Sequence, residues 1–115
     1  MFLFVYGTLK RGQPRHRYLA GQTFVASAVT RPIYRLFNVG DYPALVRHSE
    51  GRSIEGELWR VDEGCLRTLD CVEGCDKGLY AREAVELLPP HDGHNAVTYL
   101  YLLPTEGLAD CGTRW

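Results

Sequence analysis

The sequence has no excess of basic residues, since 13 lysines and arginines stand against 14 acidic residues, for a net charge of −1. Few cations are therefore left to neutralise the phosphates of a nucleic acid or to bind an anionic membrane surface. It also lacks a long apolar run, because the apolar start of the chain ends at Gly7, too soon for a signal-peptide core or a membrane span. We expect neither a nucleic-acid nor a membrane partner, and a cytoplasmic protein.

Metal and nucleotide motifs are absent as well. The four cysteines are Cys65, Cys71, Cys75 and Cys111. None forms a C-x2-C pair, and a chain with 45% hydrophobic residues has little need of disulfides, so we expect free, partly buried thiols. His91 and His94 lie in a Pro/Gly loop without a third ligand nearby, and no G-x4-G-K-[ST] phosphate loop occurs. We expect no metal and no cofactor.

The length of 115 residues predicts a single domain, residues 1–115. Apolar or alternating segments predict strands at residues 2–6, 23–30, 33–39, 44–47, 54–61, 79–88 and 96–103, and a helical turn at 16–19. Helical spacing after the N-cap Asp62 predicts one main helix to Val72. Consecutive strands favour an α+β fold, small and barrel-like, with a mostly antiparallel sheet. The strand at 54–61 is expected to contact the core with one face.

The turn after the first strand is a candidate binding site. Gly7 lets a ligand approach the main chain closely, and the N–H groups of such a turn can hold a carboxylate or an oxyanion. The alternative is an ordinary tight turn in which the Thr8 hydroxyl is satisfied locally, and the spacing alone favours this alternative.

Glu73 is a candidate catalytic residue. It follows Leu66 and Leu69 at helical spacing, so its carboxylate is expected on the helix face that otherwise contacts the core. Loss of hydration raises the pKa of a carboxyl group, as a general base working near neutrality requires. The alternative is a glutamate at a frayed helix end, exposed or paired with Arg82. Because glutamate is rarely buried, the spacing alone favours the alternative.

Basic residues follow the glycine turn, interrupted by a glycine and a proline. They are Lys10, Arg11, Arg15 and Arg17. The pattern indicates a solvated loop that could steer an acidic substrate.

Four segments occur in an order that is far more specific than any one of them. They are Phe4–Gly12 with Tyr-Gly-Thr-Leu, Gly40–Leu45 with Gly-x-Tyr-Pro-Ala, Glu55–Asp62, and Leu69–Gly74 followed by Leu79–Arg82 with Tyr-x-Arg. From Met1 to about Leu103 the chain thus resembles the γ-glutamylcyclotransferase-like family, in particular its γ-glutamylamine cyclotransferase branch. This resemblance outweighs both alternatives given above. Residues 104–115 match no motif of the family.

The resemblance implies a cofactor-independent enzyme in which the α-amine of a small-molecule γ-glutamyl substrate attacks its own γ-carbonyl and releases 5-oxoproline. It implies that Glu73 is the general acid and base. The implied substrate-binding residues are Tyr6, Gly7, Thr8, Leu9 and Tyr42, the last as a wall of the pocket.

Three other functions are compatible with the same residues. A non-catalytic module could bind a γ-glutamyl or 5-oxoproline-like ligand without turning it over. A hydrolase could remove a γ-glutamyl protecting group and yield glutamate. An interaction or redox-responsive protein could use Cys65, Cys71 and Cys75, although it would require fast-reacting thiols.

Overall fold

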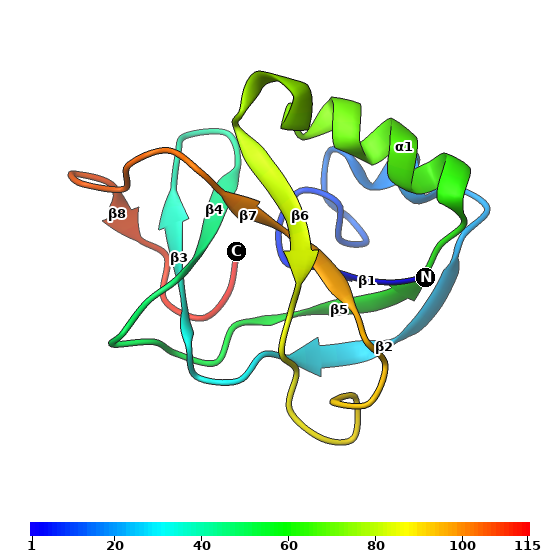
Figure 1. Cartoon of the computed structure of the whole chain (residues 1–115), viewed down its shortest axis with the longest axis horizontal. Helices are drawn as coiled ribbons and strands as arrows, with labels where there is room; N and C mark the ends of the chain where they lie inside the picture. The colour runs from blue at the N-terminus through cyan, green and yellow to red at the C-terminus, as the bar shows by residue number, and fades with distance from the viewer.

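The computed structural model describes all 115 residues, in eight strands, one α-helix and two short 3-10 turns (Figure 1). The strands are β1 (Phe2–Val5), β2 (Thr23–Val29), β3 (Tyr34–Asn38), β4 (Pro43–Arg47), β5 (Glu55–Arg60), β6 (Tyr80–Ala84), β7 (Val97–Tyr101) and β8 (Ala109–Asp110). The helical segments are α1 (Glu63–Val72), η1 (His16–Leu19) and η2 (Cys75–Lys77).

The strands form two sheets. The larger has the order β2-β5-β1-β7-β6 and the smaller the order β4-β3-β8, and only the pairing of β1 with β7 is parallel. The predicted α+β class, with one main helix and mostly antiparallel strands, is confirmed. The barrel is not closed, because the edges of the larger sheet meet only at an isolated bridge between Thr30 and Leu87.

The first strand, β1, is central and buried on both faces, as its apolar sequence predicts. Leu3 and Val5 belong to the core cluster that also contains Leu66 and Leu69 of α1, whereas Phe4 belongs to the second cluster on the other face. In Figure 1, α1 lies across the upper side of the larger sheet and the smaller sheet lies to the left. The carboxyl end of β1 therefore emerges inside the molecule, where a turn can line a pocket.

The helix α1 begins and ends where the sequence predicts. The Asp62 carboxylate accepts a hydrogen bond of 2.7 Å from the Cys65 main-chain N–H and so caps the first turn. The left-handed conformation of Gly74, with φ at 69°, ends the helix immediately after Glu73. Leu66 and Leu69 hold the helix on the sheet, which directs its last turn toward β1.

Two expectations about the surface and core are wrong. The strand β5 contacts the core with both faces, Leu58 in one cluster and Trp59 in the other, because β5 lies beside the doubly covered β1. Lys10 is not solvated: its residue is only 9% exposed, and Nζ donates a hydrogen bond of 3.0 Å to the Trp115 carbonyl oxygen.

The last twelve residues, in which the sequence showed no recognisable motif, are part of the fold. They contribute β8, which pairs with β3, and Trp115 packs against the core. The predicted strand 79–88 is shorter than expected, ending as β6 at Ala84.

The cysteines and the helices agree with the sequence in two further respects. All four cysteines are free as expected, with Cys65 buried, Cys75 and Cys111 half-buried, and Cys71 exposed. No helix is both long and apolar enough to span a membrane.

Candidate active site

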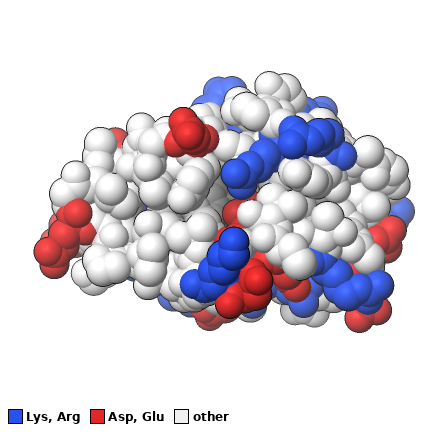
Figure 2. All heavy atoms as spheres, turned by 90° about the horizontal axis from the view of Figure 1, so that it is seen from above, with Lys and Arg blue, Asp and Glu red and all other residues white.

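The six predicted site residues line one pocket at the carboxyl end of β1. They are Tyr6, Gly7, Thr8, Leu9, Tyr42 and Glu73. The pocket has a volume of about 20 Å³, which is space for about one water molecule. Figure 2 looks down on the face that carries α1 and shows a central hollow with basic side chains near its rim and an acidic group within it.

The glycine turn presents free donors to this pocket. The main-chain N–H groups of Gly7, Thr8 and Leu9 donate no hydrogen bond, whereas all three carbonyl oxygens accept one. The donors to these oxygens are the N–H of Lys10 (3.1 Å), the N–H of Arg15 (2.9 Å) and Nδ1 of His16 (3.0 Å). Because a buried N–H group without a partner is costly, three in succession favour an anionic ligand.

Close packing explains the glycine at position 7. A Cβ atom there would lie 2.4 Å from Cγ of Pro43, so any larger residue would push the turn away from β4. Pro43 follows Tyr42 in the predicted turn, which is closed by a hydrogen bond of 3.0 Å from the Val39 N–H to the Tyr42 carbonyl oxygen. The same turn thus supplies one wall of the pocket and the contact that makes glycine necessary.

Glu73 lines the same pocket as these donors. Its half-buried carboxylate has no hydrogen bond and no ion pair. Burial raises the pKa of Glu73 to about 7, against a smaller opposing effect of the Arg15 cation. The alternative pairing with Arg82 does not occur, because Arg82 Nε contacts Asp70 Oδ1 at 3.5 Å. The site therefore holds a carboxyl group that can take or give a proton near neutral pH.

Two tyrosines that the sequence did not assign to the site, Tyr80 and Tyr99, complete the wall together with Tyr6. Tyr6 Oη donates to the Tyr99 carbonyl oxygen (2.6 Å), Tyr80 Oη to the Pro43 carbonyl oxygen (2.7 Å) and Tyr99 Oη to Asp70 Oδ1 (2.8 Å). Burial raises the pKa of Tyr6 and Tyr80 well above that of free tyrosine, so both stay neutral. Tyr80 could have been found from the Tyr-x-Arg segment, whereas Tyr99 lies in an apolar strand without a local signal.

Arg15 lies near the pocket, in the loop that the sequence indicated to be solvated and able to steer an acidic substrate. Its guanidinium carbon lies 5.9 Å from the ring centroid of Tyr42, and its charge acts on Glu73. It makes no ion pair with any carboxylate, so its charge is available to a ligand.

Histidine and cysteine do not form a second site. No group of three or more His, Cys, Asp or Glu side chains gathers in a way that could hold a metal ion. The rings of His91 and His94 stack on each other with centroids 5.5 Å apart.

The fold and the pocket define a small α+β protein in which free main-chain donors and a desolvated carboxyl group line one pocket. The sequence of residues 3–114 matches the profile of the family described as gamma-glutamyl cyclotransferase, AIG2-like. The chain belongs to this family.

Individual relatives agree with this assignment. A putative gamma-glutamylcyclotransferase of Vibrio cholerae is 38% identical over 84 residues, which cover 73% of this chain and 70% of the relative. The gamma-glutamylaminecyclotransferase of Homo sapiens is 42% identical over 93 residues, covering 74% of this chain but only 60% of the human protein's length. The crystal structure of an AIG2-like protein from Mus musculus superposes with a TM-score of 0.84 at 31% identity, covering 99% of this chain and 87% of that one.

Proposed function

We propose that this protein is a γ-glutamylcyclotransferase-type enzyme that acts on a γ-glutamyl amine or amide. It converts the substrate into 5-oxoproline and the free amine by intramolecular aminolysis. The observation that carries the proposal is that the unpaired Glu73 carboxylate and the free N–H groups of residues 7–9 belong to one pocket. Membership of the family supplies the substrate class.

The reaction needs no atom from outside the substrate. The α-amine nitrogen bonds to the γ-carbonyl carbon, and the bond from that carbon to the departing nitrogen breaks. Glu73 takes one proton from the α-ammonium group and gives one to the departing nitrogen, so the carboxylate is regenerated. The attacking nitrogen loses its second proton to solvent as the ring amide forms. Because nucleophile and electrophile belong to one molecule, the enzyme mainly has to fold the substrate into the geometry of attack.

The pocket supplies three further contributions. The N–H groups of Gly7, Thr8 and Leu9 bind the substrate carboxylate or the oxygen that gains negative charge during attack. The tyrosine wall, including Tyr42, keeps water from the reacting atoms. The pKa of about 7 lets Glu73 exist in both protonation states at neutral pH.

Product analysis tests the proposal. The purified protein is incubated with a panel of γ-glutamyl amines, and the products are identified by mass spectrometry. Release of 5-oxoproline by the wild-type protein and its loss in Glu73→Gln are expected. Glutamate, which is one water heavier, would indicate hydrolysis, and calorimetric binding without any product would indicate a binding module. Either result would contradict the proposal.

A further inference from the structure

A second carboxylate, Glu57, is buried on β5 but lies outside the pocket. The residue is only 9% exposed, although charged side chains are seldom buried unless other groups compensate them. It faces the far side of the turn that follows β1, and the proposed chemistry assigns it no role.

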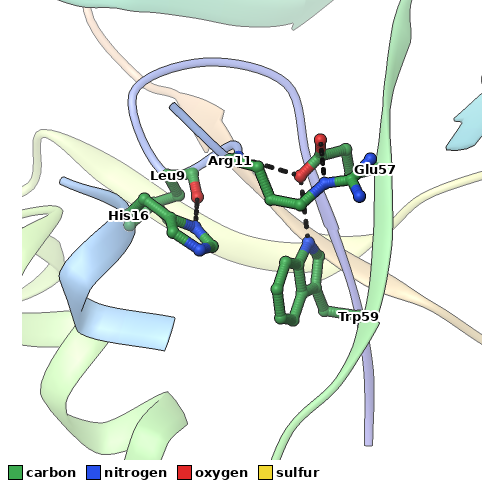
Figure 3. Close-up of polar contacts among 5 residues, drawn as sticks. All are labelled: Leu9, Arg11, His16, Glu57 and Trp59. Carbon is green, nitrogen blue, oxygen red and sulfur yellow. Dashed lines mark hydrogen bonds and ion pairs between the residues drawn. The ribbon is translucent and has the colours of Figure 1, made fainter. Parts of the chain in front are cut away.

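Three donors compensate this charge, as Figure 3 shows. Glu57 Oε1 accepts hydrogen bonds from the Arg11 main-chain N–H and from Trp59 Nε1, each 3.1 Å long. Glu57 Oε2 accepts from Arg11 Nε at 3.1 Å. Burial alone would raise the pKa of Glu57, but these donors outweigh it and hold the pKa below its usual value. The carboxylate is therefore ionised when it binds the turn.

Glu57 contacts the main chain on both sides of the turn. In the pairing of β1 with β5, Glu57 stands opposite Val5, the last residue before the turn. Its side chain then binds the main chain at Arg11, where the turn ends. The free N–H groups of residues 7–9 lie on the chain between these two fixed points.

Trp59, which donates to Glu57, also contacts the turn indirectly, through His16. The Trp59 ring packs against the His16 ring with centroids 5.2 Å apart, and His16 Nδ1 donates to the Leu9 carbonyl oxygen at 3.0 Å (Figure 3). This hydrogen bond fixes the position of the Leu9 carbonyl group.

We propose that Glu57 is a positioning residue, whose carboxylate fixes the turn so that the N–H groups of Gly7, Thr8 and Leu9 converge on the substrate. The effect of Glu57 on the order of the turn does not depend on the proposed function, whereas the consequence for catalysis rests on the function proposed above. Of the two contacts with Arg11, the main-chain hydrogen bond carries the effect. The guanidinium contact contributes little, because the Arg11 side chain is 52% exposed.

A matched pair of variants separates the acceptor from the volume of the side chain. Glu57→Met keeps the length of the side chain but has no strong acceptor. Glu57→Gln keeps one oxygen that can accept from the Arg11 N–H and from Trp59, and loses only the partner of the exposed guanidinium. Circular dichroism and denaturant unfolding first establish that both variants are folded.

NMR order parameters then measure the rigidity of the turn, and kcat/KM measures the reaction. Backbone NMR order parameters of residues 7–9 should fall from about 0.85 to below about 0.6 in Glu57→Met, while α1 stays rigid. The kcat/KM of Glu57→Met should fall about tenfold or more, mainly through KM, with the midpoint of the pH profile unchanged. Glu57→Gln should keep the turn rigid and stay within about fivefold of the wild type.

A second pair covers the case in which Glu57→Met does not fold. Arg11→Ala and Arg11→Pro both remove the guanidinium, but only proline removes the N–H group that Glu57 binds. Arg11→Pro should therefore reproduce the loss of order and activity, and Arg11→Ala should not.

The outcomes distinguish this inference from the proposed function. A turn that stays rigid in Glu57→Met and Arg11→Pro would overturn the inference, and so would a disordered turn with unchanged kcat/KM. If the wild-type protein released no 5-oxoproline, the proposed function would fail, but the order parameters would still decide whether Glu57 fixes the turn.

Discussion

The raised pKa of Glu73 predicts how the stability of the protein depends on pH. In the unfolded chain this carboxyl group titrates near its ordinary value of 4.5, whereas burial raises its pKa to about 7 in the folded protein. Between these values the folded state binds more protons than the unfolded state, so the free energy of unfolding falls as the pH rises. The stability associated with Glu73 is complete below pH 4.5 and is lost by the time the pH exceeds 7.

The magnitude follows from the two pKa values. Integrating the linkage relation from about pH 5 to about pH 8 gives a loss of about 2.5 kcal/mol. Glutamine at position 73 cannot ionise, so Glu73→Gln should escape this loss. The free energy of unfolding of the variant minus that of the wild type should therefore increase by about 2.5 kcal/mol from pH 5 to pH 8.

Denaturant unfolding of both proteins at the two pH values measures this difference, because contributions from other titrating groups cancel in the comparison. Glu106→Gln is the matched control, since Glu106 is an exposed glutamate without a side-chain partner. For this control, the difference in the free energy of unfolding from the wild type should be the same at both pH values. The same result for Glu73→Gln would refute the argument that burial of Glu73 raises its pKa.

Three further predictions concern the pocket. The kcat/KM for 5-oxoproline release should increase as the pH rises through about 7, because the free enzyme needs Glu73 in its charged form, and a flat profile from acid to neutral pH would count against this role. Gly7→Ala should lose about 1–3 kcal/mol of stability in denaturant unfolding and most of its activity, since its methyl group would overlap Pro43; wild-type stability would show that the turn yields freely. Arg15→Ala should move the midpoint of the pH profile upward, because the Arg15 cation lowers the pKa of Glu73, and a downward shift would contradict the assigned electrostatics.

Local sequence patterns predicted the elements that carry the candidate site. The N-cap Asp62 and the spacing of Leu66 and Leu69 act within a few turns of one helix, so the bounds of α1 could be predicted from the local pattern. The inward position of Glu73 was expected only with the family resemblance, because the spacing alone favoured a frayed helix end. The apolar run of β1 and its glycine turn were equally local signals.

Long-range contacts could not be predicted in this way. The burial of Lys10 depends on Trp115, 105 positions away, and the hydroxyl group of Tyr99 depends on Asp70, 29 positions away. The strand at 54–61 was expected to contact the core with one face only, because the pattern does not reveal that a turn will cover Glu57 with donors. The arrangement into two sheets likewise depends on which strand edges meet, and no periodicity encodes this.

The most direct test of the account compares Glu73→Gln with the wild-type protein in two measurements at about pH 8. The account predicts that 5-oxoproline release from a γ-glutamyl amine falls about a hundredfold or more, as expected for loss of the group that transfers the proton. It predicts that calorimetric binding of 5-oxoproline is retained, because the N–H groups of residues 7–9 are unchanged. Equal rates of release in the two proteins would contradict it.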